Sequence, residues 1–175
     1  MTVKLVYETH STTVDNETGI ATGWLPGELS AEGRRESVLL GERRQDVDAI
    51  FSSDLLRAVK TVEIAFEGQA IPRFQDWRLR ECDYGELNGA PVEQLAPRRP
   101  KVGVPFPGGQ SYRDVLGLTQ SFLADIKGPY DGRKVLVVGH GAQRWALQHL
   151  LGDGTPLEDL VDAPFAWQPG WEYEL

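Results

Sequence analysis

The run Val135-Leu136-Val137-Val138 constrains the fold more than any other stretch of the chain. Four consecutive apolar residues, three of them β-branched, are typical of a strand that is buried on both faces of its sheet. An amphipathic helical pattern follows from about residue 142 to 151. A strand of this kind must be covered by helices on both sides, so the rest of the chain has to supply them.

Apolar runs of strand length alternate along the chain with segments in which apolar residues recur at helical spacing. The predicted strands cover 3–7, 47–51 and 71–74, and the predicted helices cover 31–44, 55–66, 111–126 and a short segment from Thr155. The aromatic tail, 165–175, predicts an edge strand or two. This alternation predicts a parallel or mixed sheet with helices on both faces.

Composition limits the number of domains and the kind of partner. With 175 residues the chain is long enough for one domain with its own core, so we expect a single domain over 1–175. A net charge of −8 and a pI near 4.9 argue against nucleic-acid and anionic-membrane partners, which require a basic face. We expect neither a secretion signal nor a membrane span, because residues 1–4 are not followed by a long apolar segment and no apolar run reaches roughly 18 residues. Because Cys82 is the only cysteine, we expect a reduced, cytoplasmic setting.

Two of the three histidines follow predicted strands at the point where each strand ends. His10 comes after the first strand, and His140 comes after the strand that ends at Val138. If these strands are parallel neighbours, both imidazoles lie in one crevice at their carboxyl ends, together with Arg57 and Glu81. Two imidazoles, a guanidinium and a carboxylate suit an anion, most simply a phosphate. They suit a divalent metal less well, because Arg57 would repel it.

Each of these residues also has an ordinary structural explanation. His140 could be a buried histidine with a backbone partner, and Arg57 a surface charge on its helix. Glu81 could be a solvated loop acid, since Asp83 and Glu86 lie close to it in the sequence. Asn16 could simply shape a turn.

The ordered series of motifs resembles the histidine phosphatase superfamily, also called the phosphoglycerate mutase-like family. The resemblance covers nearly the whole chain, and the order of its segments is more specific than any one of them. The segments are Thr9-His10-Ser11-Thr12-Thr13 with Asn16, then 23–33, Ser52-Ser53-Asp54-Leu55-Leu56-Arg57-Ala58, 78–85, 107–111 and Val137-Val138-Gly139-His140-Gly141. Together with the strand–helix alternation, the resemblance implies a three-layer α/β/α sandwich with a mostly parallel central sheet and an antiparallel edge.

The resemblance also implies a two-step reaction without a metal or an organic cofactor. His10 would attack phosphorus and form a phosphohistidine, which water then hydrolyses. Glu81 would be the general acid and then the general base. The remaining catalytic or phosphate-binding residues implied by the resemblance are His140, Arg57, Asn16, Thr9, Ser11 and Gly141.

The sequence departs from the family at the first motif. Thr9 stands where the family has an arginine that binds phosphate, and Ser11 replaces a glycine. The pocket therefore loses a charge and a bidentate donor. Three arginines are candidates to supply the missing cation, namely Arg78, Arg80 and Arg144, and the hydroxyls of residues 11–13 could replace part of the hydrogen bonding.

Three functions are compatible with these residues. The first is a phosphatase that acts on a small phosphorylated metabolite. The second is a catalytically weak module that binds a phosphate ligand, since Thr9 weakens the pocket. The third is a phosphoglycerate-type mutase, which the short chain disfavours. The aromatic C-terminal edge could also pair with a second copy to form a homodimer.

Overall fold

The central feature of the structure, a computed structural model that describes all 175 residues, is a five-stranded mixed sheet. The strand order is β4-β3-β6-β1-β7, with four strands parallel and β7 antiparallel at the edge. The strands are β1 (Lys4–Thr9), β3 (Ala49–Ser52), β4 (Arg73–Gln75), β6 (Lys134–Gly139) and β7 (Trp171–Glu174). The predicted antiparallel edge is confirmed, as a single strand.

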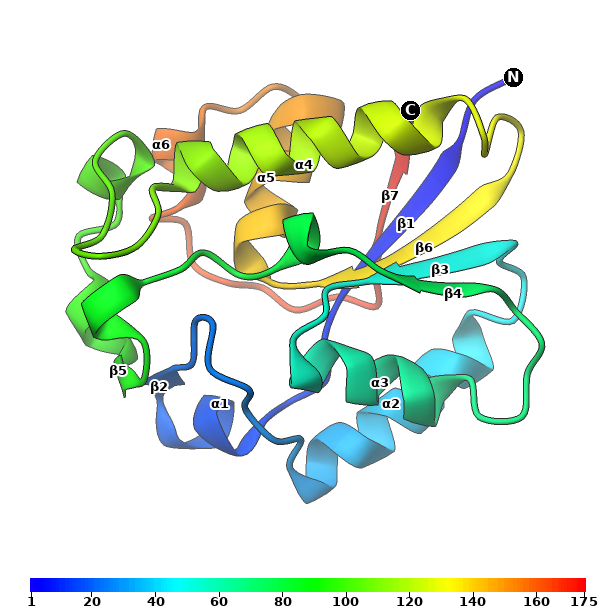
Figure 1. Cartoon of the computed structure of the whole chain (residues 1–175), viewed down its shortest axis with the longest axis horizontal. Coiled ribbons are helices and arrows are strands. Elements are labelled where there is room, and N and C mark those ends of the chain that lie inside the picture. The colour runs from blue at the N-terminus through cyan, green and yellow to red at the C-terminus, as the bar shows by residue number, and fades with distance from the viewer.

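Helices cover both faces of this sheet, which confirms the predicted three-layer sandwich. Figure 1 shows α4 and α5 on one side and α2 and α3 on the other. Their bounds are α2 (Ala31–Arg43), α3 (Leu56–Ala65), α4 (Tyr112–Lys127) and α5 (Gly141–Leu151). Each begins within two residues of its predicted start. Ser30 caps α2 and Ser111 caps α4 through their side-chain oxygens, which fixes where these two helices begin.

Strand β6 supplies both halves of the core because its side chains alternate between the two faces. Val135 and Val137 pack in the cluster that includes Phe122 of α4. Leu136 and Val138 pack in the cluster that includes Leu40 and Val62 of α2 and α3. This explains why the run at 135–138 is continuously apolar rather than alternating.

The register of the parallel strands aligns their carboxyl ends. Thr9 of β1 pairs with Gly139 of β6, and Ser52 of β3 pairs with Val138. The residues that follow these pairs, which include His10, Ser53 and His140, therefore leave the sheet at the same edge. Small elements gather at this edge (Figure 1), namely α1 (Val14–Thr18), β2 (Ile20–Ala21), β5 (Ala90–Pro91) and α6 (Leu157–Leu160).

The segment between β4 and α4 forms the outer part of this edge. It contains short 3-10 turns, and its apolar side chains pack in a third cluster against α4, α5 and α6. That cluster includes Tyr84, Leu95 and Phe106, all buried. This segment is thus a packed wall of the domain. None of the helices is long and apolar enough to cross a membrane.

Two helical glycines differ in what surrounds them. Substituting each with alanine tests how closely α2 approaches the backbone at Thr12. A Cβ on Gly33 of α2 would lie 1.9 Å from the carbonyl oxygen of Thr12, whereas one on Gly117 of α4 meets no atom within 4 Å. We expect Gly33→Ala to lower the free energy of unfolding by about 1–3 kcal/mol, because the backbone must shift. Gly117→Ala should raise it by about 0.5–1 kcal/mol, because alanine favours the helix. Urea unfolding measures both, and a gain in both variants would contradict the close approach of α2.

Candidate active site

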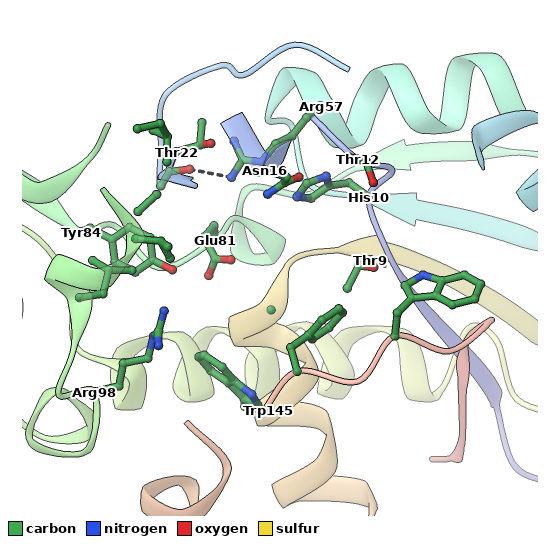
Figure 2. A pocket seen from close by; sticks show the side chains of 18 of the residues that line it. Thr9, His10, Thr12, Asn16, Thr22, Arg57, Glu81, Tyr84, Arg98 and Trp145 are labelled. Atoms are coloured by element: carbon green, nitrogen blue, oxygen red, sulfur yellow. Dashed lines mark hydrogen bonds between the residues drawn. The ribbon is translucent and has the colours of Figure 1, made fainter. Parts of the chain in front are cut away.

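A cavity of about 480 Å³ opens at the carboxyl ends of the parallel strands. Its volume suits a small organic ligand. Six of the eight residues expected at the site line it, and Figure 2 shows most of them converging on this space. The six are Thr9, His10, Asn16, Arg57, Glu81 and Gly141. The other two, Ser11 and His140, are buried and do not line the cavity.

The hydrogen bond of His10 defines its tautomer. Nδ1 lies 2.8 Å from the carbonyl oxygen of Ser11, so Nδ1 must carry the hydrogen and donate it. The lone pair is therefore on Nε2. Burial and the nearby Arg57 charge lower the pKa of His10 to about 3, so the ring is neutral at neutral pH. His10 thus presents an uncharged nitrogen with a free lone pair.

His140 lies beside His10, with 5.0 Å between the ring centroids. Its Nε2 is 2.7 Å from the hydroxyl of Ser53, and its buried Nδ1 has no hydrogen-bond partner in the protein. Burial lowers the pKa of His140 well below its usual value, and the charge of Arg57 adds to this effect. One nitrogen of this neutral ring therefore has no hydrogen-bond partner within the protein.

Arg57 and Asn16 use part of their bonding capacity to hold the loops that carry the site. The buried Arg57 guanidinium, at the start of α3, donates to the carbonyls of Leu25 (2.9 Å) and Gly23 (2.8 Å). The Oδ1 of Asn16 accepts from the amide of Thr13 at 3.0 Å, in the capping box of α1. The side-chain nitrogen of Asn16, Nδ2, has no partner in the protein and can donate within the cavity.

Glu81 lies in a loop, yet its backbone is held from two sides. The indole of Trp24 donates to the Glu81 carbonyl at 2.7 Å, and Gln143 of α5 donates to the carbonyl of Arg80. The carboxylate accepts from the amide of Cys82 at 2.8 Å. Burial raises the pKa of Glu81, and this effect outweighs the lowering by that amide and by Arg57. A carboxyl of this kind can hold a proton at a higher pH than an exposed glutamate can.

The hydroxyls next to His10 have structural partners. The Ser11 side chain is buried and accepts from Ser37 of α2 at 2.8 Å, and its amide donates to Thr61 of α3. Thr12 lines the cavity, but both its amide and its hydroxyl donate to Glu36. The structure therefore does not bring Ser11 to the cavity, and it leaves Thr12 with a carboxylate partner.

None of the three arginines expected to replace the cation lost at Thr9 lines the cavity. Arg78 is bound to Asp76 and Asp125, Arg80 is bound to Asp54, and Arg144 stacks on aromatic rings.

A different cation, Arg98, lines the cavity, and it was not predicted from the sequence. Its buried Nε has no hydrogen-bond partner. Arg98 follows Pro97 and precedes Arg99, which pairs with Asp159 on the surface. Nothing in the local sequence distinguishes the two arginines. In Figure 2, Arg98 lies on the far side of Glu81 from His10, so it is not a cation beside the first motif.

The side chains of this cavity suit a tetrahedral oxyanion rather than a metal. No group of three or more histidine, cysteine, aspartate or glutamate side chains is arranged to hold an ion. A neutral histidine lines the same cavity as Arg57, Asn16 and Glu81, whose carboxyl has a raised pKa. This combination, at the carboxyl edge of an α/β/α sandwich, has the chemistry that binding of a phosphoryl group requires.

Comparison with known proteins identifies the family. A profile of the histidine phosphatase superfamily, branch 1, matches residues 9–166, and the chain belongs to this superfamily. It is 30% identical over 170 residues to a 2,3-bisphosphoglycerate-dependent phosphoglycerate mutase of Bradyrhizobium sp., covering 87% of this chain and 82% of the relative.

Solved structures show the same relationship. Bacillus stearothermophilus YhfR superposes with a TM-score of 0.83 at 29% identity, covering 95% of this chain and 88% of that one. A mycobacterial glucosyl-3-phosphoglycerate phosphatase, solved with VO3, superposes with a TM-score of 0.76 at 30% identity, covering 90% and 85%. The fold is thus the phosphoglycerate mutase-like one expected from the sequence.

Proposed function

We propose that this protein is a cytoplasmic phosphatase that hydrolyses phosphate monoesters of small metabolites through a phosphohistidine on His10. The tautomer of His10 carries the proposal. Its Nδ1 donates to the carbonyl of Ser11, which leaves a neutral Nε2 lone pair in the cavity as a nucleophile. The relatives with phosphatase and mutase names support phosphoryl transfer at this site.

In the first step, the Nε2 lone pair attacks phosphorus and the bond from phosphorus to the ester oxygen breaks. The electron pair leaves with that oxygen, and Glu81 supplies the proton that makes it an alcohol. Arg57, the Asn16 amide and the free nitrogen of His140 hold the non-bridging oxygens. For His140 this requires Ser53 to donate to its Nε2, so that its Nδ1 carries the hydrogen. The backbone at Gly141 and the Thr9 hydroxyl complete this set.

In the second step, the now ionised Glu81 takes a proton from water, and the water oxygen attacks phosphorus. The phosphorus–nitrogen bond breaks, its electron pair returns to His10, and inorganic phosphate leaves. Glu81 ends protonated and His10 ends neutral, as they began. Neither step requires a metal or an organic cofactor.

The direct test is release of inorganic phosphate from a panel of sugar, nucleotide and hydroxy-acid phosphates. Hydrolysis of at least one ester, with loss of activity when Glu81 or His10 is changed, is the expected result. Binding of phosphate without release from any ester would replace the proposal with the weak binding module. Conversion of one phosphoglycerate isomer into the other without net hydrolysis would replace it with the mutase.

Thr9→Arg should restore the cation that the first motif lacks. Thr9 lines the cavity next to His10, so a guanidinium there can add a charge-assisted hydrogen bond to a phosphoryl oxygen. We expect competitive inhibition by inorganic phosphate to strengthen by about tenfold, which corresponds to a hydrogen bond of roughly 1.5 kcal/mol. Thr9→Gln lengthens the side chain and adds an amide donor without charge, and it serves as the control. Equal effects of the two variants would show that charge at this position does not reach the phosphate.

The dependence of kcat/KM on pH should report Glu81 and not His10. With a pKa of about 3, His10 is already neutral in mildly acidic solution, so it produces no acid limb above about pH 4. Glu81 must be protonated in the free enzyme, and burial raises its pKa, so kcat/KM should fall as pH rises through that pKa. In the Glu81→Gln variant, the only ionisation left in the pH profile of kcat/KM should be that of the ester itself. An acid limb near the ordinary histidine pKa would contradict this assignment.

A further inference from the structure

One wall of the cavity is aromatic, and two of its rings are exposed. Tyr84, Trp145, Phe165 and Trp167 all line the cavity. Tyr84 and Trp145 are packed edge-on against Phe106 and Tyr112. Phe165 and Trp167, in contrast, are 59% and 62% exposed. Large apolar side chains that are exposed inside a concave site mark a surface that a ligand covers.

The segment that carries these two rings is held in place although it has no helix or strand. It joins α6 to β7, and Val161 is buried at its start. Near its end, the carbonyl of Pro169 accepts from Arg44 at 2.6 Å, and Arg44 also pairs with the buried Glu8 of β1 at 2.6 Å. The backbone is therefore fixed next to the cavity while the rings remain open.

Phe165 also contacts a cation, the guanidinium of Arg144. The guanidinium of Arg144 lies 5.6 Å from the Phe165 ring centroid and 5.3 Å from that of Trp171. Arg144 makes no ion pair or hydrogen bond through its buried Nε. A cation over a ring face is attracted to the ring, so this contact stabilises the observed position of Phe165.

A second observation indicates that this half of the cavity contacts a ligand. The buried Nε1 of Trp145 and the buried Nε of Arg98 have no hydrogen-bond partner in the protein, and both residues line the cavity. Figure 2 shows Trp145 and Arg98 on the opposite side of Glu81 from His10. The cavity therefore extends beyond Glu81 from His10, and two donors without a partner in the protein lie in that part of it.

We infer that Phe165 and Trp167 form a subsite for an aromatic ring, so that the preferred substrates are phosphate monoesters whose alcohol carries such a ring. This inference rests on the proposed function, and it names the substrate class of the same site. Flat rings stack on exposed aromatic side chains, and each such pair strengthens binding beyond the area that it buries.

The first test compares 2-phenylethyl phosphate with ethyl phosphate, because both release aliphatic alcohols and differ mainly in the ring. We expect kcat/KM to be about tenfold or more higher for the ring-bearing ester, the effect of roughly 1.4 kcal/mol. The double variant Phe165→Ala/Trp167→Ala should lose this preference and retain its activity on ethyl phosphate. An equal loss on both esters, or no preference in the parent protein, would overturn the subsite.

Two controls test whether aromatic rings in the cavity cause the preference for the ring-bearing ester. Phe74→Ala and Trp77→Ala remove rings that are 46% and 52% exposed outside the cavity, and both should keep the preference. 2-Cyclohexylethyl phosphate has a ring of similar size that is not flat, and it should be a poorer substrate than the aromatic ester. If it is equally good, the subsite is apolar and not aromatic, and the inference is wrong.

A binding measurement separates this inference from the proposed function. 2-Phenylethylphosphonate cannot be hydrolysed, and calorimetric titration should show that it binds the parent more tightly than ethylphosphonate does, by a factor that the double variant loses. Ring-dependent binding without turnover of any ester would overturn the phosphatase and support the subsite. Turnover of ethyl phosphate without ring-dependent binding would overturn the subsite and support the phosphatase.

Discussion

His10→Ala should lower the rate of phosphate release by at least about 10⁴-fold, since removing a nucleophile leaves only what binding and charge stabilisation contribute. The His10 side chain is partly exposed at the cavity and lies outside the three apolar core clusters. The variant should therefore fold, with a circular dichroism spectrum like that of the parent. Phosphate release from the best ester of the panel measures the effect.

His149→Ala is the matched control. His149 is on α5, where its Nδ1 lies 2.9 Å from the carbonyl of Thr155, and it does not line the cavity. Its replacement should leave turnover close to that of the parent. If His10→Ala keeps a substantial part of the activity, water attacks the ester directly and the histidine has another role.

Glu81→Gln should lower turnover by about 10²–10⁴-fold, the range for loss of a general acid or base. The effect should differ between the two steps. An ester with a good leaving group, such as 4-nitrophenyl phosphate, needs little help from an acid, so phosphorylation of His10 should remain fast. Hydrolysis of the phosphohistidine needs the base and should become slow. We therefore expect a burst of nitrophenolate equivalent to the enzyme, followed by a slow steady rate.

Glutamine keeps the size of Glu81 and can still accept from the Cys82 amide, so the loop should keep its position. Stopped-flow absorbance measures the burst and the steady rate. Absence of a burst, together with an equal loss on 4-nitrophenyl and alkyl phosphates, would indicate that Glu81 positions the substrate and transfers no proton.

The strand–helix alternation predicted the fold because the decisive signals are local. The apolar run of β6 and the capping serines of α2 and α4 lie within a few residues of the elements that they specify. Strand β4 was expected at 71–74 and is found at Arg73–Gln75, since all three of its residues are exposed and give little apolar signal. Helix α1 was not predicted, because it has five residues and no buried side chain.

The candidate site could likewise be predicted from the sequence only in part. His10, Arg57 and Glu81 were expected together, because each follows a strand end in the sequence and parallel strands bring their ends to one edge. The partner of Ser11 could not be predicted, since it lies on α2, 26 residues further along the chain. Arg98 and the exposed rings at 165 and 167 also reach the cavity only through tertiary packing.

The central claim is that His10 carries the phosphoryl group. Glu81→Gln should accumulate this intermediate, so the variant is mixed with 4-nitrophenyl phosphate and quenched in alkali, because phosphohistidine is labile in acid. Mass spectrometry of the digested protein should then show phosphate on the peptide that contains His10, and none when His10 is alanine. A burst without phosphate on His10, or phosphate found on another residue, would contradict the account.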